Sequence, residues 1–176
     1  MVFCEILLKK RVHLFKNEKA FTLIEISVVL SMLSIIAMLV YPQFNGLFDD
    51  IALEQAANQL ASDIQYIKQK SVANDGKGLP KILISSNENC YYIYEKSYKI
   101  EKKIDLAEKH NNRVEILGYN GTLNEISFNY LGTPTHCGTV AIHNNNNGKT
   151  KYVIVSPVIG RIRVDDTPPS SWKYSQ

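Results

Sequence analysis

The apolar run at residues 21–41 constrains this chain more than any other part of its sequence. The run consists of Leu, Ile, Val, Met, Ala and aromatic residues, interrupted only by Thr22, Glu25 and three serines. Because about twenty helical residues at a rise of 1.5 Å span the roughly 30 Å hydrocarbon core of a bilayer, the run predicts a transmembrane helix. The serines are compatible with this helix, since each hydroxyl can bond to the backbone carbonyl one turn back.

Glu25 is the residue that a simple membrane anchor leaves unexplained. A charged side chain inside the hydrocarbon layer is costly, and such residues mark functional positions in membrane segments. A removable secretory signal peptide is the rival interpretation, but residues 38–43, at the end of the run, contain no small-x-small cleavage site. The carboxylate at the head of the run therefore indicates a signal for assembly.

Basic residues are concentrated before the apolar run. Residues 1–20 contain five Lys and Arg against two Asp and Glu, which accounts for the whole formal net charge of +3. Such a bias keeps the N-terminus in the cytoplasm and sends the rest of the chain across the membrane. The chain from residue 21 onward is formally neutral.

Residues 20–25, Ala-Phe-Thr-Leu-Ile-Glu, together with Pro42 closely resemble the N-terminus of type IV prepilins and of the pseudopilins of type II secretion and competence machines. The resemblance implies that a prepilin peptidase cleaves between Ala20 and Phe21 and methylates the new amine of Phe21. Family members usually have Gly before the cut, where this chain has Ala20. The resemblance also implies a helix break at Pro42, and it gives Glu25 a partner: the free amine of an adjoining subunit's Phe21, which neutralises the buried carboxylate.

Beyond Pro42 the pattern becomes amphipathic and then changes to short strands. Apolar residues recur between Phe44 and Ile67 every three to five positions, which predicts a helix that continues to about Ala73. Turn formers at 74–80 then end it. Seven β-branched or aromatic runs follow, at 81–85, 90–95, 113–117, 125–130, 139–143, 152–155 and 161–164. Residues 98–109 fit a strand, a short helix or a loop.

This order predicts an α+β fold in which a long N-terminal helix packs on a small antiparallel β-sheet domain. The expected segments are a cleaved cytoplasmic leader (1–20), a transmembrane assembly helix (21–41), an amphipathic spine (42–73), a β-rich extracytoplasmic domain (74–164) and a flexible tail (165–176). A second resemblance, to minor pseudopilins of the GspH and FimT type, rests on residues 53–65, 126–132, 138–142 and 153–164. It implies the same pilin-like fold.

Arg161 and Arg163 are candidate DNA contacts. Alternation along a strand sends Ile162 and Val164 to the core and both arginines to one exposed face, where guanidinium groups suit phosphate. In some FimT-like proteins a Gly-Arg-x-Arg element of this kind is linked to DNA binding during natural transformation.

The alternative is that the two arginines have no binding role and only keep the outer face of the strand soluble. A formally neutral chain beyond the leader gives little general attraction to nucleic acid. Lys149 and Lys151 would enlarge the basic patch if the last two strands pair.

The remaining polar residues suggest no chemistry of their own. Cys90 and Cys137 stay after the leader is removed, and both a disulfide between them and two free thiols remain open. His136, Cys137 and His143 lack a fourth ligand, so neither a metal nor another cofactor is expected. Phosphate-binding loops, nucleophile elbows and His-Glu-x-x-His runs are missing from the sequence, which predicts a protein that is not an enzyme.

The chain is accordingly expected to be a structural minor pilin or pseudopilin that assembles into a type II secretion or type IV pilus-like filament, at or near its tip. Its expected partners are prepilin peptidase, other pilins, an inner-membrane assembly platform and membrane lipid, with no small-molecule substrate. It would cross the cytoplasmic membrane once, with its N-terminus in the cytoplasm. Two alternatives remain: a DNA-binding minor pilin for DNA uptake through Arg161 and Arg163, and a simple membrane-anchored extracellular domain.

Overall fold

The computed structural model describes most of the chain from Phe21 to Trp172. The described residues are 21–73, 78–96, 99–121, 123–170 and 172. The expected leader, with Ala20 at the cleavage position, lies outside them, as does the end of the expected tail. The chain divides into two compact units, residues 1–43 and 44–176, so the boundary falls two residues after the predicted one.

Helix α2, Leu23–Ala73, ends at the predicted residue. The helix assignment continues through Pro42, and the helix break that the resemblance implies there stays a prediction. A proline removes one N–H donor from the helix, but the turns on either side keep their own hydrogen bonds and can carry the helix past it. Within the described residues, no helix is both long enough and apolar enough to cross a membrane on its own.

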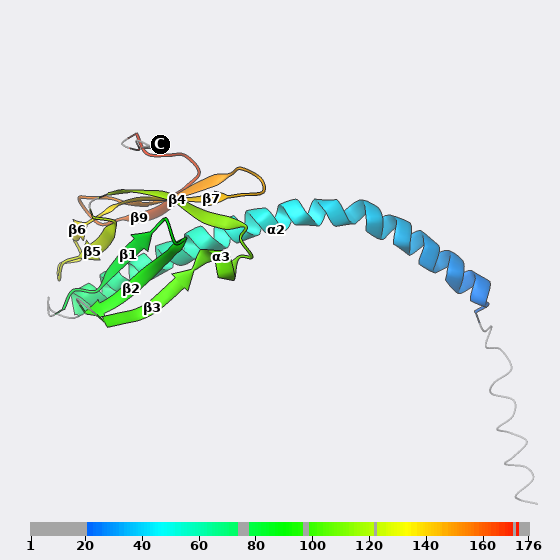
Figure 1. The fold of residues 1–176 in the computed structure, drawn as a ribbon, viewed down its shortest axis with the longest axis horizontal. Coiled ribbons are helices and arrows are strands. Elements are labelled where there is room, and N and C mark those ends of the chain that lie inside the picture. The colour runs from blue at the N-terminus through cyan, green and yellow to red at the C-terminus, as the bar shows by residue number, and fades with distance from the viewer. Residues whose placement is uncertain (1–20, 74–77, 97–98, 122, 171, 173–176) are drawn as a thin grey trace, which may run out of the picture. The chain divides into compact units, whose positions relative to one another are not determined.

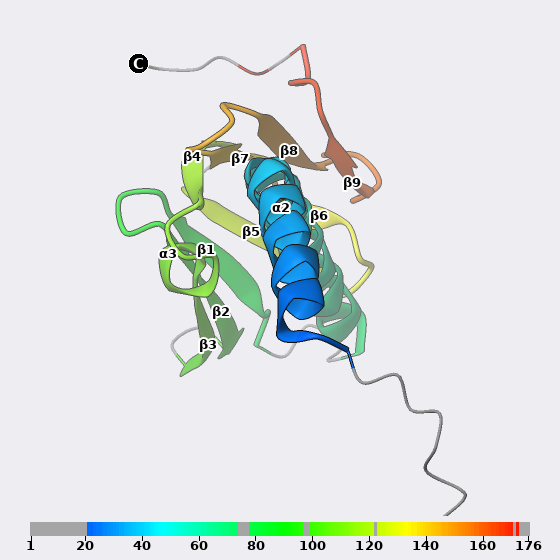
Figure 2. The same ribbon diagram turned by 90° about the vertical axis from the view of Figure 1, so that its right-hand side faces the viewer.

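The strands form two antiparallel sheets where the sequence predicted one. The elements after α2 are β1 (Lys81–Ser85), β2 (Cys90–Lys96), β3 (Lys99–Asp105), α3 (Leu106–Lys109), β4 (Val114–Gly121), β5 (Glu125–Phe128), β6 (Pro134–His136), β7 (Gly138–Asn144), β8 (Thr150–Val155) and β9 (Ile162–Asp165). One sheet has the order β3-β2-β1-β5-β6 and the other the order β4-β7-β8-β9. Figure 1 labels these strands except β8, which Figure 2 labels.

Both sheets pack on one face of α2. The fully buried helix residues recur at helical spacing and are Leu53, Ala56, Ala57, Leu60, Ile64 and Ile67. Ile82 and Ile93 from the five-stranded sheet and Val140 and Val153 from the four-stranded sheet join them in one cluster. Figure 2 looks along α2 and shows strands of both sheets around it. Burying each large aliphatic side chain contributes about 1.5–3 kcal/mol, so this helix face holds the unit together.

The apolar stripe of α2 is buried over a shorter length than the sequence predicted. Leu47, Phe48 and Ile51 are 53%, 53% and 41% exposed, and continuous burial starts at Ala52 and Leu53. The sheets therefore cover the helix only from this turn onward, and the first apolar residues of the stripe remain accessible.

Several connections differ from the sequence-based expectation. The undecided segment is both a strand, β3, and a one-turn helix, α3, which is capped by Asp105, whose Oδ1 accepts from the Glu108 N–H at 3.1 Å. Strand β6 is not among the strands that the sequence predicted. The expected tail begins one residue later, because Asp165 belongs to β9, and Trp172 packs edge-on against Tyr152 with ring centroids 5.5 Å apart.

Gly160 forms a β-bulge between β8 and β9. Its N–H donates to Ser156 O at 3.0 Å, while the Ser156 N–H donates to Arg161 O at 2.9 Å. This pattern is a bulge that requires a left-handed first residue, and Gly160 has φ +60°. A Cβ at this position would also lie 2.9 Å from Gly132 O. The extra residue fixes which face of the sheet each side chain of β9 occupies.

Gly160→Ala is expected to lower the free energy of unfolding by about 2–3 kcal/mol. A left-handed residue with a Cβ costs roughly 1–2 kcal/mol, and the close approach to Gly132 adds to this cost. Gly148→Ala is the matched control, because Gly148 has φ +71° but open space around it, and about 1 kcal/mol is expected there. Denaturant unfolding of the full chain in detergent measures both values, and equal losses would show that the contact with Gly132 carries no energy.

Candidate functional site

The first turn of α2 is closed by a side-chain cap. The Glu25 N–H donates to Thr22 Oγ1 at 3.2 Å, and the Ile26 N–H donates to Thr22 O at 3.2 Å. Thr22 is therefore the N-cap, and Glu25 stands at the third helical position, where the helix dipole favours a carboxylate. The sequence analysis missed this role of Glu25, although a Thr followed by Glu three residues later is a known cap signature.

The side chains at residues 21–39 are all exposed in the single chain. The predicted serine bonds are confirmed: Ser27 donates to Leu23 O, Ser31 to Ser27 O and Ser34 to Leu30 O, at 2.7–2.8 Å. The hydroxyls are thus satisfied within the helix. What this segment offers to other molecules is apolar surface with one carboxylate, Glu25, at its start.

A polar cluster fastens α2 to the end of the four-stranded sheet. We name it the helix clamp, and it consists of Asp49, Asp50, Arg113, Asn144, Asn146 and Asn147. Asp49 is only 6% exposed. Its Oδ1 accepts from Arg113 Nη1 at 2.7 Å and from Asn146 Nδ2 at 2.8 Å, and its backbone O accepts from Asn144 Nδ2 at 2.7 Å.

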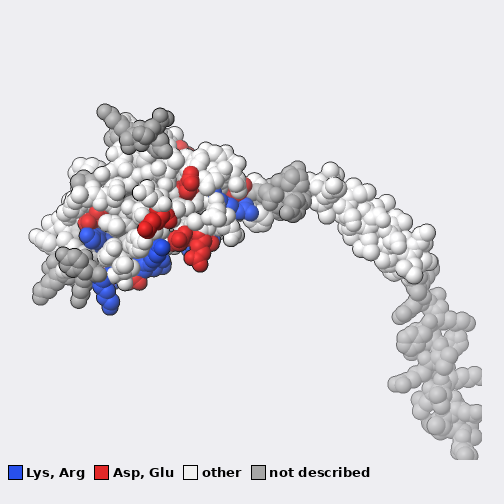
Figure 3. Space-filling view, in the orientation of Figure 1, with Lys and Arg blue, Asp and Glu red and all other residues white. Residues whose placement is uncertain are grey.

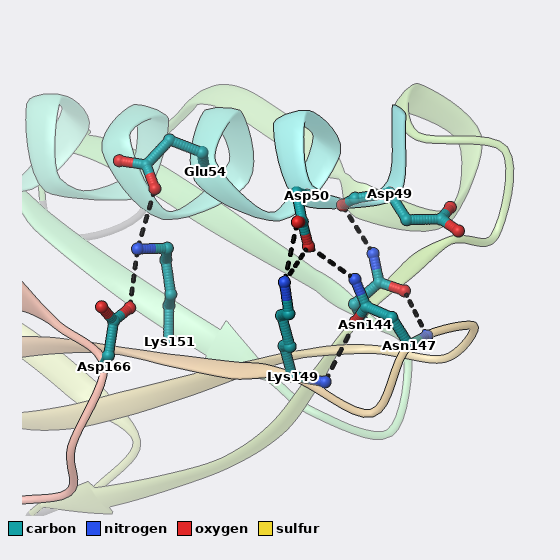
Figure 4. Close-up of polar contacts among 8 residues, drawn as sticks. All are labelled: Asp49, Asp50, Glu54, Asn144, Asn147, Lys149, Lys151 and Asp166. Carbon is teal, nitrogen blue, oxygen red and sulfur yellow. Dashed lines mark hydrogen bonds and ion pairs between the residues drawn. The ribbon is translucent and has the colours of Figure 1, made fainter. Parts of the chain in front are cut away.

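The sequence analysis assigned no contact to the asparagine run at residues 144–147. In the structure Asn144 is fully buried, and Asn147 Nδ2 donates to Asp50 Oδ1 at 2.8 Å, as Figure 4 shows. About a hundred residues separate these partners along the chain, so no local pattern in the sequence reveals the pairing.

Two lysines extend the contact between α2 and the sheet. Lys149 reaches Asp50 at 2.7 Å, and Lys151 lies between Glu54 at 2.8 Å and Asp166 at 2.7 Å (Figure 4). The hydrogen bonds that Lys151 donates to Asp166 and Glu54 raise the pKa of Lys151, and the bond from Lys151 lowers the pKa of Glu54. A carboxyl with a lowered pKa stabilises the fold above its ordinary pKa, and that stabilisation is lost as the pH falls through the lowered value.

The two candidate DNA-contact residues lie on the face predicted for them. Arg161 and Arg163 are exposed, whereas Ile162 and Val164 pack against the core. Arg163 has one ionic neighbour, Asp165, at 3.8 Å.

The predicted enlargement of the basic patch by lysines is wrong. Val153 and Val155 of β8 face the core, and Lys151 shares their face by alternation, so it points toward α2 and away from the arginines. Lys149 is likewise held by Asp50. Figure 3 shows Lys and Arg interspersed with Asp and Glu on the visible face of the unit, without a large patch of one sign.

The possible disulfide is corrected, because Cys90 and Cys137 are both free. Cys90 lies in β2 and Cys137 follows β6, three strands away in the same sheet. Strands are spaced about 4.8 Å apart, so roughly 14 Å separates these positions, well beyond the span of a disulfide. Burial raises the pKa of both thiols.

The two histidines near Cys137 make separate contacts. His136 Nδ1 is 3.0 Å from Ser127 Oγ, and His143 Nδ1 is 2.9 Å from Thr150 Oγ1. Among the residues that the structure describes, no group of three or more His, Cys, Asp and Glu side chains could hold a metal ion.

Comparison with known proteins gives the class of the N-terminal segment. The prokaryotic N-terminal methylation motif matches residues 15–41, which include the predicted cleavage position, Phe21 and Glu25. This match makes the segment type IV prepilin-like, and the predicted resemblance is confirmed over these residues.

A curated relative agrees with this class. The chain is 37% identical over 72 residues to the competence protein ComGD of Bacillus subtilis (strain 168). The alignment covers 41% of this chain and 49% of the relative, so the chain spans about half the length of the curated relative that it matches. No solved structure matches the chain.

Arg113→Gln is expected to lower the free energy of unfolding by about 2–3 kcal/mol, because it leaves the buried Asp49 carboxylate without its cation. Asp49→Asn removes the charge together with the need for a cation, and about 1 kcal/mol is expected. The double variant should then be close to Asp49→Asn alone, a coupling of about 2–3 kcal/mol in a double-mutant cycle.

The control for this cycle is Lys149→Gln, which breaks an exposed ion pair. Its side chain and that of Asp50 are 61% and 46% exposed, so less than about 1 kcal/mol is expected. Denaturant unfolding measures all four variants. Strictly additive losses for Asp49 and Arg113 would contradict the assignment of this pair as the centre of the helix clamp.

Proposed function

We propose that this chain is a non-enzymatic minor pilin or pseudopilin that a prepilin peptidase cleaves before Phe21. Residues 21–41 would anchor it once in the cytoplasmic membrane, N-terminus inside, and carry it into a type II secretion or type IV pilus-like filament, at or near the tip. Its partners would be other pilins, an inner-membrane assembly platform and lipid. The match to the methylation motif and the similarity to a competence protein support the proposal.

One observation carries the assembly mechanism: a capped helix that exposes an apolar surface with a single carboxylate in its first turn. The apolar side chains can pack on lipid or on other helices without selecting a position along them. A carboxylate in such surroundings is costly unless a cation meets it. The methylated amine of a neighbouring subunit's first residue can supply that cation at one height only, so Glu25 would set the register.

The β-rich unit would then act as a head carried by the spine. Its core is continuous along α2 from Leu53 to Ile67, and the helix clamp holds the first covered turn of the helix to the sheet. A subunit of this kind would first be cleaved by the peptidase and would then be assembled into the filament. The rival class, a simple anchored domain, predicts that no cleavage occurs before Phe21.

Glu25→Gln and Glu25→Ala are both expected to insert and to be cleaved before Phe21. Both should reduce co-purification with neighbouring pilin subunits by at least about a hundredfold, because an amine left without its carboxylate in apolar surroundings costs roughly 3–5 kcal/mol. N-terminal mass spectrometry reports the cleavage and the methylation, and quantitative pull-down from membranes reports the assembly.

The Gln variant separates charge from capping, since Gln keeps the size and the hydrogen-bonding capacity of Glu at this helix position. Thr22→Ala is the complementary control, because it weakens the cap by about 1 kcal/mol and keeps the charge, and it should assemble. Normal co-purification of Glu25→Gln together with loss in Thr22→Ala would replace the register mechanism with a purely structural role.

DNA binding is the second candidate function, and the exposure of Arg163 in β9 and of Arg161 directly before that strand favours it. Two planar cations on alternate residues of a strand can each contact a phosphate. The chain from residue 21 onward is formally neutral and adds little long-range attraction, so contact would depend on these two groups. Such a subunit would serve DNA uptake.

Arg161→Gln/Arg163→Gln is expected to reduce the salt dependence of DNA binding by up to about two phosphate contacts in the logarithmic plot. The control is Lys149→Gln/Lys151→Gln, which removes the same formal charge from lysines that reach acids on α2. A titration of the full chain in detergent over a range of salt measures both slopes. If the slope falls equally in the two double variants, the arginines are not a specific DNA-binding site.

A further inference from the structure

A groove of about 570 Å³ lies between α2 and the edge strand β9. The helix contributes small and polar side chains, which are Asn58, Ala61, Ser62, Gln65, Tyr66 and Gln69. The strand contributes Ile162, Arg163 and Val164. The groove therefore has a polar helix wall and a wall made of strand edge.

The backbone of β9 presents hydrogen-bonding groups to this groove. β9 is the last strand of its sheet and, among the strands that the structure describes, pairs only with β8, with Ile154 opposite Arg163. The bond from the Ser156 N–H to Arg161 O fixes the alternation, so Arg161 and Arg163 turn their backbone groups toward β8. Ile162 and Val164 therefore direct their N–H and C=O groups away from β8, toward the groove.

The other sheet edges carry features that discourage an added strand. β3 is rich in lysine, β6 has three residues and starts with Pro134, and β4 has a register shift between Ile116 and Gly118. β9 has neither a proline nor a bulge within its four residues. Its edge is thus the open one, and only an extended polypeptide matches such a row of donors and acceptors.

The side chains of β9 define the chemistry of that polypeptide. Side chains of an added strand would alternate between the two faces of the sheet, beside those of β9. On the face toward α2 they would meet Ile162, Val164 and the small residue Ala61. On the opposite face they would meet Arg161 and Arg163, of which Arg163 is 52% exposed with a single ionic neighbour 3.8 Å away.

We propose that this groove binds an extended acidic segment of a partner polypeptide, which adds to the four-stranded sheet beside β9. The segment would alternate Asp or Glu, next to the arginines, with small or apolar residues that face α2. The main-chain bonds would give affinity and the two arginines would select the charge. The inference goes beyond assembly through residues 21–41 and does not depend on it.

The test titrates the isotope-labelled full chain in detergent with short synthetic peptides. The probe is a peptide of alternating Asp and Val, and the controls are alternating Lys and Val, and the acidic peptide with every second amide N-methylated. The acidic peptide should bind and slow amide exchange at Ile162 and Val164. The basic peptide should bind at least about tenfold more weakly, and the methylated peptide should give no protection, since it cannot form the strand bonds.

Variants of Val164 separate the backbone contact from the side chain. Val164→Pro removes an N–H that points into the groove and no bond to β8, and proline is tolerated at such edge positions. This substitution should lower the affinity for the acidic peptide by about tenfold. That is the effect of losing one hydrogen bond whose partner is left unpaired. Val164→Ala keeps the N–H, and its affinity for the acidic peptide should stay within about threefold of that of the unaltered chain.

Three outcomes would overturn the proposal. They are binding of acidic and basic peptides alike, binding without protection of the two amides, and self-association that Val164→Pro abolishes, which would place a second copy of the chain at the edge. Duplex DNA that protects the same amides would assign the surface to nucleic acid instead. Glu25→Gln should leave peptide binding unchanged, so failure of filament assembly and failure of this inference are seen separately.

Discussion

The burial of one face of α2 beneath two sheets is the interaction on which the rest of the domain depends. Ala56 and Ala57 are fully buried, and their small side chains let strands approach the helix closely, while Leu53, Leu60 and Ile64 fill the space between. Neither sheet has another large apolar surface to cover in the described part of the chain. Each sheet is therefore placed by its contact with the same helix stripe.

This arrangement explains where polar groups are tolerated inside the unit. Where the sheets begin to cover α2, the buried carboxylate of Asp49 accepts from the Arg113 guanidinium and the Asn146 amide, and its backbone oxygen accepts from the Asn144 amide. Further along, Tyr91 donates to Asp63 Oδ2 at 2.6 Å, and burial together with that carboxylate raises the pKa of the phenol. Both groups lie at the rim of the apolar stripe, where each buried donor or acceptor has a partner.

The sequence predicted the features that local pattern controls. The end of α2 at Ala73, the serine bonds in the apolar segment and the outward face of Arg161 and Arg163 all follow from spacing of three to four residues or from alternation of two. The class of the N-terminal segment followed from a short motif around Phe21.

What the sequence did not predict depends on contacts between distant segments. The division into two sheets, the separation of Cys90 from Cys137 and the pairing of Asn144 with Asp49 are properties of the assembled fold. The bulge at Gly160 was missed for a different reason: a glycine before a strand reads as a turn, and only the two crossed bonds to Ser156 reveal the additional residue.

The helix clamp has a mechanical consequence. The bonds from Arg113, Asn144 and Asn146 all end on one residue of α2, Asp49, and all cross from sheet to helix. A force along the helix axis would act on these three bonds in parallel and in shear. It would do so before it reached the apolar contacts at Leu53 and beyond. Tension would therefore be shared among several short links at the entrance of the domain, and no single link would have to bear it alone.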